Sequence, residues 1–174
     1  MKPREVPDRD SFYIAMAFWA ASRSKDPNSQ CGAFIISEQN EPLGWGYNGP
    51  PKKINDHDIT WTRPEKYDFI VHAEVNAIQH ARGNLENSTI YVTAKPCKSC
   101  MLNIVSSGIK RVVYFPFKSK DKNSMLCSTE ISEKTSKIAK LGDVVLEEFT
   151  QDLNWMLERI NWMKSEGIFE QIRV

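Results

Sequence analysis

Apolar positions along the chain follow two spacings, and each spacing predicts one kind of element. Where they recur every three to four residues we expect a helix, and where they follow one another between turn residues we expect a strand. Helices are predicted over about 11–22, 70–82, 97–107, 130–141 and 152–164, and strands over 33–37, 42–47, 89–94, 111–115 and 144–149. Asp10 or Ser11 is the expected N-cap of the first helix, and residues 1–10 are expected to form a polar N-terminal arm.

The order of these elements predicts an α/β protein. Gln39 and Asn40 form the expected turn between the first two strands, which therefore pair antiparallel. The last two strands are joined through the predicted helix 130–141, and a helical crossover of this kind permits parallel pairing. We therefore expect one domain over residues 1–174 with a three-layer α/β/α fold, in which a mixed five-stranded sheet lies between two helical layers.

The last two helices carry apolar stripes. In helix 130–141, Ile131, Ile138 and Leu141 are expected to face inward. In helix 152–164 the apolar residues extend beyond one face, which predicts that part of an oligomer contact lies there. These residues are Leu153, Trp155, Met156, Leu157, Ile160, Trp162 and Met163.

Charge and cysteine content narrow the class of partner. The 174 residues include 23 Lys and Arg and 22 Asp and Glu, a balance that lacks the basic excess of a polynucleotide-binding protein. A small-molecule substrate is therefore favoured, and no nucleic-acid partner is expected. The apolar run Phe12–Ala21 is too short to span a bilayer, so no membrane partner is expected either. Four cysteines are too few for a disulfide scaffold.

Two short motifs, His72-Ala73-Glu74 and Pro96-Cys97-Lys98-Ser99-Cys100, carry the candidate chemistry. Cys97 and Cys100 lie on one face of the first turn of a helix, and with His72 they supply the three protein ligands of an open zinc site. Residues two apart on a helix point nearly in opposite directions, so His72 must stand at the start of its helix for Glu74 to face the same metal. This joint pattern is the signature of zinc nucleobase deaminases, in which the glutamate is the general acid/base and not a ligand.

Each part of the pattern has a simpler interpretation when taken alone. A C-x-x-C pair also occurs in redox motifs and structural zinc sites, and a single histidine is more often a core residue. A structural zinc site normally has four protein ligands, and no second close Cys/His pair stands in this sequence. We therefore favour the catalytic interpretation, in which zinc thiolates imply a reducing cytosol.

In the expected reaction Glu74 takes a proton from an attacking water and passes it to the ring nitrogen and the departing amine of a pyrimidine. Ammonia leaves, and a carbonyl remains at C4. The positive end of each helix dipole favours the thiolate form of the cysteines. Ala73 is small enough to let the ring approach the backbone, although ordinary helix composition explains it equally well.

Four segments resemble deoxycytidylate (dCMP) deaminases, in the order which that family has them, over roughly residues 10–115. They are Arg23–Gln30, Gly46–Gly49 followed by prolines, His72–Ile78 and Pro96–Cys100. The resemblance implies a cytidine-deaminase-like fold, a zinc ion, conversion of dCMP to dUMP, and supply of dUMP for thymidylate synthesis. It also implies a homo-oligomer, often a hexamer, that is activated by dCTP and inhibited by dTTP with Mg²⁺. We expect a cytoplasmic location, or the host cytoplasm if the protein is viral.

The resemblance further implies roles for individual residues. His72, Cys97 and Cys100 match the zinc ligands, and Glu74 matches the proton shuttle. Asn48 matches the asparagine that holds the substrate sugar, and an amide suits a hydroxyl because it both donates and accepts. A turn residue that tolerates positive φ is the alternative for Asn48.

Two basic residues are expected at the other end of the substrate. Arg23 and Lys25 would hold the 5′-phosphate, and a solvated loop is the alternative for both. The segment Gly46-Tyr47-Asn48-Gly49 is expected to couple the active site to a nucleotide effector site at a subunit contact, because its glycines permit close approach to phosphates. A tight strand-to-loop turn without regulatory meaning is the alternative.

The sequence also departs from the family pattern. Cys31 stands where we expect an apolar residue such as valine, and Phe115-Pro116-Phe117-Lys118 lacks an aligned tyrosine that we associate with substrate closure. His57 is expected to be solvated rather than part of a second, structural zinc site. Asn76 either braces the site or faces solvent, and Cys127 is expected to be a free thiol.

Two other functions compete with this interpretation. A base deaminase acting on tRNA or single-stranded DNA shares the metal motif, but it needs a basic groove with stacking aromatic residues. Lys118, Lys120 and Lys122 are basic, yet Asp121 interrupts them. A catalytically idle, zinc-stabilised subunit is the other alternative, and the intact Glu74 argues against it.

Overall fold

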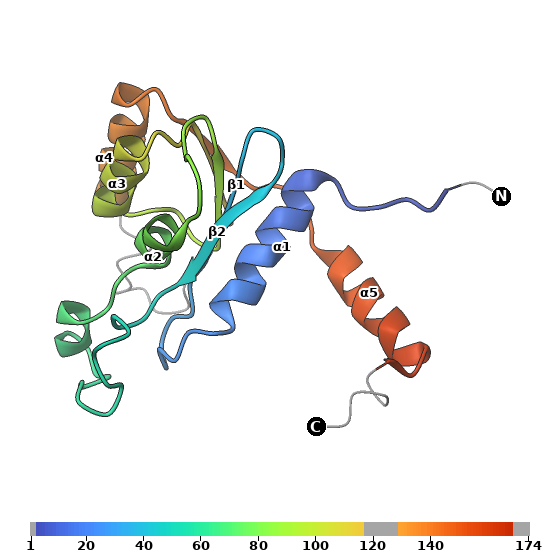
Figure 1. The fold of residues 1–174 in the computed structure, drawn as a ribbon, viewed down its shortest axis with the longest axis horizontal. Coiled ribbons are helices and arrows are strands. Elements are labelled where there is room, and N and C mark those ends of the chain that lie inside the picture. Colours follow the sequence, from blue (N-terminus) through green and yellow to red (C-terminus); the bar gives the residue numbers. More distant parts are fainter. Residues whose placement is uncertain (1–2, 117–128, 169–174) are drawn as a thin grey trace.

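The computed structural model describes residues 3–116 and 129–168 (Figure 1). The helices are α1 (Arg9–Ala21), α2 (Ala73–His80), α3 (Lys98–Ser106), α4 (Thr129–Leu141) and α5 (Asn154–Ser165), with a 3₁₀ helix η1 (Glu65–Asp68). The strands are β1 (Gly32–Ile36), β2 (Pro42–Tyr47), β3 (Thr89–Val92), β4 (Arg111–Tyr114) and β5 (Val145–Glu148). Within the described ranges, none of the helices has the length and apolar character needed to cross a membrane.

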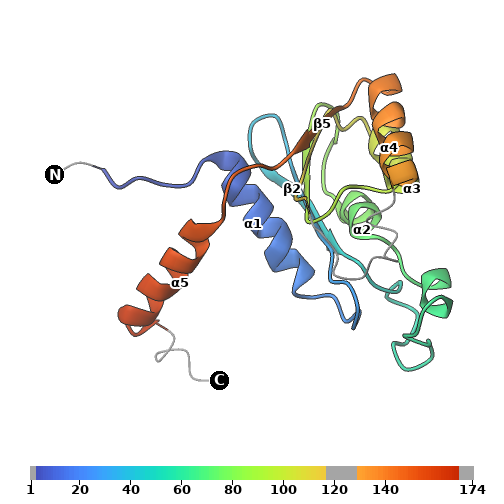
Figure 2. The ribbon, with the colours of Figure 1, turned by 180° about the vertical axis from the view of Figure 1, so that it is seen from behind.

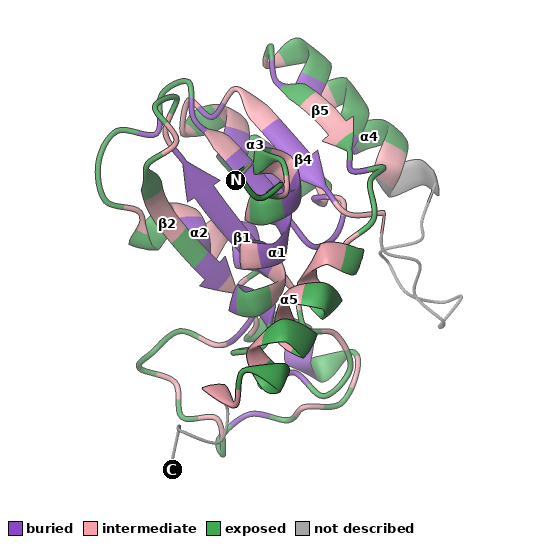
Figure 3. Ribbon diagram, turned by 90° about the vertical axis from the view of Figure 1, so that its right-hand side faces the viewer, coloured by how far each residue is buried: buried purple, intermediate pink, exposed green. Residues whose placement is uncertain are grey.

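The strands form one mixed five-stranded sheet in the order β2-β1-β3-β4-β5. β1 pairs antiparallel with β2 and with β3, whereas β3, β4 and β5 run parallel to one another. The predicted sheet is therefore confirmed, and so is the parallel pairing of the last two strands through a helical crossover. Strand β1, which lies between β2 and β3, is buried along its whole length, as Figure 3 shows, because both faces of the sheet are covered.

Alternate residues of the strands pack into two separate cores, one on each face of the sheet. Ile35 and Ile90 face the core that α2, α3 and α4 cover, together with Met101 and Ile104 of α3. Phe34 and Tyr91 point to the opposite face, where they meet Ile14 and Ala17 of α1. Figures 1 and 2 show the same division, with α1 on one side of the sheet and α2, α3 and α4 on the other, which confirms the three layers.

The first helix begins earlier than the sequence indicates. Asp8 is its N-cap, because the Asp8 carboxylate accepts a hydrogen bond of 3.0 Å from the backbone N–H of Ser11. Asp10 belongs to the first turn, where it accepts from both terminal nitrogens of Arg111 (2.8 and 2.6 Å) and from the Tyr91 hydroxyl (2.7 Å). The hydrogen bonds from Arg111 lower the pKa of Asp10. Arg9 and Asp10 are thus part of α1 and not of an extended arm.

The inward orientation expected in helix 130–141 is confirmed for Ile138, which packs against the core, and is wrong for Leu141. In α5 the apolar side chains remain largely uncovered by this chain. No residue of α5 is buried, and Leu157 and Trp162 are 62% and 46% exposed. α5 lies outside the layers next to α1 (Figure 2), where the Trp155 ring stacks on Phe12 at 6.5 Å. Leu141 is 78% exposed, since the backbone of the following Gly142, and not the leucine side chain, approaches α3. The side chain of Ile131 lies outside the described part of the chain.

Candidate active site

A cleft of about 540 Å³ opens where α2 and α3 begin. Its walls come from the loop before β1, the residue after β2, segments 63–75 and 92–100, and one residue of α4. Both helices point their N-termini at this cleft, so their free backbone N–H groups make the site favourable for negative charge. His72, Ala73, Glu74, Cys97 and Cys100 all line it.

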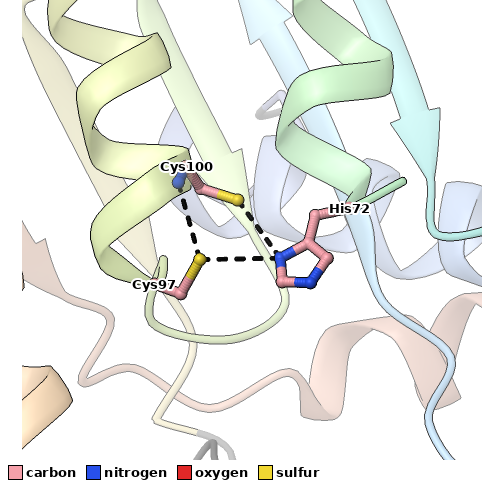
Figure 4. Close-up of side chains that lie close together, drawn as sticks. All are labelled: His72, Cys97 and Cys100. Atoms are coloured by element: carbon pink, nitrogen blue, oxygen red, sulfur yellow. Dashed lines mark hydrogen bonds between the residues drawn. The ribbon is translucent and has the colours of Figure 1, made fainter. Parts of the chain in front are cut away.

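His72, Cys97 and Cys100 come together at these two helix starts (Figure 4). His72 is the N-cap of α2 and has an extended backbone (φ −70°, ψ 154°), which turns its ring toward α3. Cys97 is the N-cap of α3, and its sulfur accepts a hydrogen bond of 3.5 Å from the backbone N–H of Cys100. His72 Nδ1 lies 3.2 Å from Cys100 Sγ and 3.6 Å from Cys97 Sγ.

The donor set and its spacing fit a zinc ion. A tetrahedral zinc with Zn–S bonds of about 2.3 Å and Zn–N bonds of about 2.0 Å separates its nitrogen and sulfur ligands by about 3.5 Å. The observed Nδ1–Sγ distances of 3.2 and 3.6 Å lie on either side of this value, and the candidate ligand atoms all lie within 4.8 Å of one another. Within the described residues this is the one such group of three or more His, Cys, Asp or Glu side chains, and Glu74 is not among its members.

Without a metal, the three candidate ligands share protons through their hydrogen bonds, and zinc binding has to displace the protons held by His72 and Cys100. Hydrogen bonds from Cys100 and from His72 lower the pKa of the Cys97 thiol to about 3. The hydrogen bond to Cys97 raises the pKa of His72 to about 9, against the opposing effect of burial. The hydrogen bond to Cys97 raises the pKa of Cys100, which keeps its proton. Cys97 is therefore a thiolate at neutral pH.

Glu74 occupies the first turn of α2 and is buried at the base of the cleft. Burial raises the pKa of its carboxyl group, and the positive charge of His72 partly offsets this effect. The carboxyl group also interacts with the Cys100 thiol. Because His72 stands at the cap position, a residue two places later faces the same cleft, as the spacing predicts.

Ala73 and Gly46 bring the edge strand β2 directly against α2. Ala73 is fully buried. A Cβ atom on Gly46 would lie 2.5 Å from the carbonyl oxygen of Ala73 and 2.4 Å from the nitrogen of Ala77, so only glycine fits there. At Gly49, by contrast, the nearest atoms to such a Cβ belong to the Tyr47 ring, at 3.8 Å. Packing alone thus accounts for one glycine of the 46–49 segment and leaves the other unexplained.

Asn48 lines the cleft, and the partners of its side chain fix the orientation of the amide. Its Oδ1 accepts a hydrogen bond of 2.8 Å from the backbone N–H of Cys31, and its Nδ2 donates a hydrogen bond of 2.9 Å to the carbonyl of Ser29. The second lone pair of Oδ1 is left for a ligand. Asn48 has no positive φ, so the interpretation as a left-handed turn residue is wrong.

The basic residues expected at the phosphate do not reach this cleft. Neither Arg23 nor Lys25 lines it, and both side chains are exposed. Lys25 forms an ion pair with Asp56 in the loop that follows β2. The motif order placed these residues near the site, but the chain turns them outward before Asp26 enters the wall of the cleft. The fold therefore does not support their proposed role within one chain.

A buried ion pair beside Asn48 is the feature that the sequence did not reveal. Lys66 Nζ lies 2.7 Å from both carboxylate oxygens of Asp26, and the two side chains are 2% and 4% exposed. Lys66 also donates to Asn28, and Asp26 accepts from the backbone N–H groups of Asn28 and Ser29. Forty residues separate the pair, and each stands in a polar segment that reads as solvent-exposed loop.

The remaining sequence expectations have mixed outcomes. His57 is exposed, as expected for a solvated side chain. Burial raises the pKa of Cys31 to about 12, so this cleft residue is a neutral thiol. Asn76 does brace the site, since its amide donates 2.8 Å to the carbonyl of Tyr47. Phe117, Lys118, Lys120, Lys122 and Cys127 lie outside the described residues.

Known proteins are similar to this chain in sequence and in fold. A family profile described as "Cytidine and deoxycytidylate deaminase zinc-binding region" matches residues 7–116. The human deoxycytidylate deaminase is 38% identical over 117 residues, which cover 63% of this chain and 66% of that protein. The mouse deoxycytidylate deaminase is 34% identical over 146 residues, or 80% of this chain and 78% of that protein.

Among solved structures, the dCMP deaminase from the cyanophage S-TIM5 in complex with dCMP and dUMP shares the fold, with a TM-score of 0.63. It is 21% identical, and the match covers 84% of this chain and 100% of that one. The profile match alone spans more than half of the chain and includes the buried glutamate and all the candidate zinc ligands. This chain belongs to the cytidine and deoxycytidylate deaminase family.

Proposed function

We propose that this protein is a zinc-dependent deaminase that hydrolyses dCMP to dUMP and ammonia, and so supplies dUMP for the synthesis of dTMP. The observation that carries the proposal is the cleft itself, in which His72, Cys97 and Cys100 meet beside a buried glutamate that is not one of the candidate ligands. The relatives that cover two thirds or more of this chain support the choice of substrate, because the mouse protein is named deoxycytidylate deaminase.

His72, Cys97 and Cys100 would hold Zn²⁺ through one nitrogen and two sulfurs. A zinc ion with three protein ligands would lower the pKa of a water molecule toward neutrality, and hydroxide, the nucleophile, would then be available at neutral pH. Glu74 accepts the first proton of the attacking water and delivers it to N3, and it then carries the second proton, from the new hydroxyl group at C4, to the departing amine. A C4–O bond forms, the C4–N bond breaks, ammonia leaves and a carbonyl remains. Burial at the start of α2 holds the Glu74 carboxyl group in place for both transfers.

Asn48 is proposed to bind the sugar of the nucleotide. Its Nδ2 is used by the Ser29 carbonyl, so the free lone pair of Oδ1 makes it an acceptor for a sugar hydroxyl. Ala73 forms the neighbouring wall of the cleft without filling it. Asn48→Ala should raise KM for dCMP and lower kcat less.

The segment Gly46-Tyr47-Asn48-Gly49 is proposed to transmit the binding of dCTP, which activates, and of dTTP with Mg²⁺, which inhibits. Gly49 exchanges two backbone hydrogen bonds with Val71 (3.1 and 3.0 Å), the residue before His72. A displacement of this segment would therefore move both a substrate contact and a candidate zinc ligand. Because couplings of this kind are about 1–3 kcal/mol, each effector should change the rate at low dCMP by roughly five- to a hundredfold.

We further propose that one domain over residues 1–174 assembles into a homo-oligomer, with a hexamer favoured, in the cytoplasm or host cytoplasm. Phe12, Trp19 and Trp162 expose apolar surface on α1 and α5, which a second copy could cover. Measuring the mass in solution tests this assembly. A monomer with hyperbolic, effector-blind kinetics would contradict both the assembly and the regulation and leave the deaminase intact.

The experiment that tests the function is ammonia release from dCMP by the purified, zinc-loaded protein. We expect conversion of dCMP to dUMP at a rate that falls when a chelator removes the zinc and returns when zinc is added back. Cytosine in a short single-stranded DNA serves as the competing substrate. Activity on the DNA without activity on dCMP would contradict the proposal.

A further inference from the structure

The basic side chains that line the cleft differ in whether a carboxylate pairs with them. Lys66 is matched by Asp26 at 2.7 Å, so it adds no net charge. Arg63 sits on the same side, where one of its terminal nitrogens contacts the Ser29 hydroxyl at 3.3 Å. On the α3 side of the cleft stands Lys95, which directly precedes Pro96 and Cys97. Among the side chains of residues 3–116 and 132–168, none is a carboxylate that forms an ion pair with Lys95.

Lys95 is held in place by hydroxyl groups of α4. Its ammonium group donates 2.7 Å to the Ser132 hydroxyl and 3.2 Å to the Ser136 hydroxyl, and it lies 5.5 Å from the centre of the Tyr114 ring. Thr135 also ties α4 to the segment that carries Lys95, because its hydroxyl donates a hydrogen bond of 3.0 Å to the carbonyl of Pro96. The lysine is thus half-buried and oriented by hydroxyl groups rather than by a carboxylate.

This arrangement has the chemistry of a subsite for an anion. Ser132 lines the cleft beside Lys95, and a hydroxyl that accepts a hydrogen bond from the lysine can still donate its own proton to a ligand. The ammonium group and the hydroxyl together offer one charge and one further donor. Such a pair suits a phosphate monoester, which has three acceptor oxygens and up to two negative charges.

We propose that Lys95 and Ser132 form the subsite for the 5′-phosphate of the substrate nucleotide, and that they determine the preference for a nucleotide over a nucleoside. This inference rests on the proposed function, which places the pyrimidine ring at His72, Cys97 and Cys100 and the sugar at Asn48. It also supplies the cation that Arg23 and Lys25 do not, since they lie outside the cleft. The lysine stands three residues after the end of β3 and two residues before Cys97, so base and phosphate are recognised from one segment.

The test compares dCMP with deoxycytidine on the zinc-loaded wild type and on Lys95→Met, which keeps the length of the side chain and removes its charge. Charge-assisted contacts of this kind change kcat/KM by about ten- to a hundredfold. We expect kcat/KM of Lys95→Met to fall by about that factor for dCMP and to change less than threefold for deoxycytidine. Lys95→Arg should retain most of the preference for dCMP.

Two further measurements keep the inference testable if Lys95→Met folds poorly. Ser132→Ala should lower kcat/KM for dCMP by about two- to tenfold and leave kcat/KM for deoxycytidine unchanged, because it removes one donor and no charge. Binding of 2-deoxyribose 5-phosphate to the wild type, followed by calorimetry, should be measurable and should weaken in the Ser132→Ala protein. Lys110→Met is the matched control, since it removes a lysine whose partner Asp143 is 94% exposed, and it should not change the dCMP to deoxycytidine ratio.

Three outcomes would overturn the inference. Equal losses on dCMP and deoxycytidine would show that Lys95 and Ser132 only support the fold of the cleft. A wild type that accepts deoxycytidine as well as dCMP would show that no phosphate subsite exists, while the deaminase itself would stand. A wild type that deaminates neither substrate would contradict the proposed function, and the phosphate subsite with it.

Discussion

Replacing Lys66 by methionine removes one charge of a buried pair and leaves the other in place. Asp26 then loses an ammonium group 2.7 Å from each of its carboxylate oxygens, at a site where both side chains are at most 4% exposed. Breaking a buried pair in this way costs about 3–5 kcal/mol, because a charge stays buried without its partner. Asp26 keeps the backbone N–H groups of Asn28 and Ser29, which places the expected loss near 3 kcal/mol.

For a chain of this length, 1 kcal/mol lowers the midpoint of thermal unfolding by about 2–4 °C, so Lys66→Met should lower it by about 6–12 °C. The double variant Asp26→Asn, Lys66→Met has no charge left to bury. It should therefore recover most of the loss and unfold within about 1 kcal/mol of the wild type. The free energy of unfolding is read from urea denaturation of the zinc-loaded protein, with zinc content measured in parallel.

Lys110→Met is again the matched control, because the Lys110–Asp143 pair is exposed and lies 3.1 Å apart. Its removal should change the free energy of unfolding by less than about 0.5 kcal/mol. The reasoning would be refuted if Lys66→Met were as stable as this control. It would be refuted equally if the double variant were less stable than Lys66→Met.

Other expected outcomes follow from packing, charge and substrate contacts. Gly46→Ala should destabilise the fold by about 1–3 kcal/mol in thermal unfolding, since its Cβ would lie within 2.5 Å of the α2 backbone, whereas Gly49→Ala should cost much less; equal costs would contradict this. Asp10 has a pKa lowered by Arg111, so its contribution is complete above about pH 4, the value in the unfolded chain, and is lost as the pH falls through the lower folded value. Urea midpoints measured against pH should therefore fall less steeply below about pH 4 for Asp10→Asn than for the wild type. Asn48→Ala should raise KM for dCMP more than it lowers kcat, and steady-state kinetics that show the reverse would remove Asn48 from the sugar contact.

Much of the fold follows from local patterns in the sequence. The strand over 42–47 has the predicted bounds, and the crossover between the last two strands sets their parallel pairing. Placing His72 at a helix start needed only the geometry of a helix and the demand that Glu74 face the same point. In each case, the information lies within a few residues of the element.

What the sequence could not show depends on contacts between distant segments. Asp26 stands in a polar loop and Lys66 in the short 3₁₀ helix η1, and nothing in the neighbouring sequence indicates that the two segments meet. The apolar faces of α5 were identified, but an amphipathic pattern does not say whether the surface is covered by the same chain. A single lysine after a strand has no distinguishing pattern, so the sequence does not indicate a role for Lys95, which depends on the hydroxyl groups that α4 supplies.

The central claim is that Glu74 moves protons and does not hold the metal. Glu74→Gln keeps the size of the side chain and removes its ability to accept a proton, so zinc content and ammonia release from dCMP are measured together on the wild type and this variant. We expect one zinc per chain in both proteins, with kcat in the variant lower by about a hundred- to ten-thousandfold. A variant that retains full activity, or one that loses its zinc, would contradict the account.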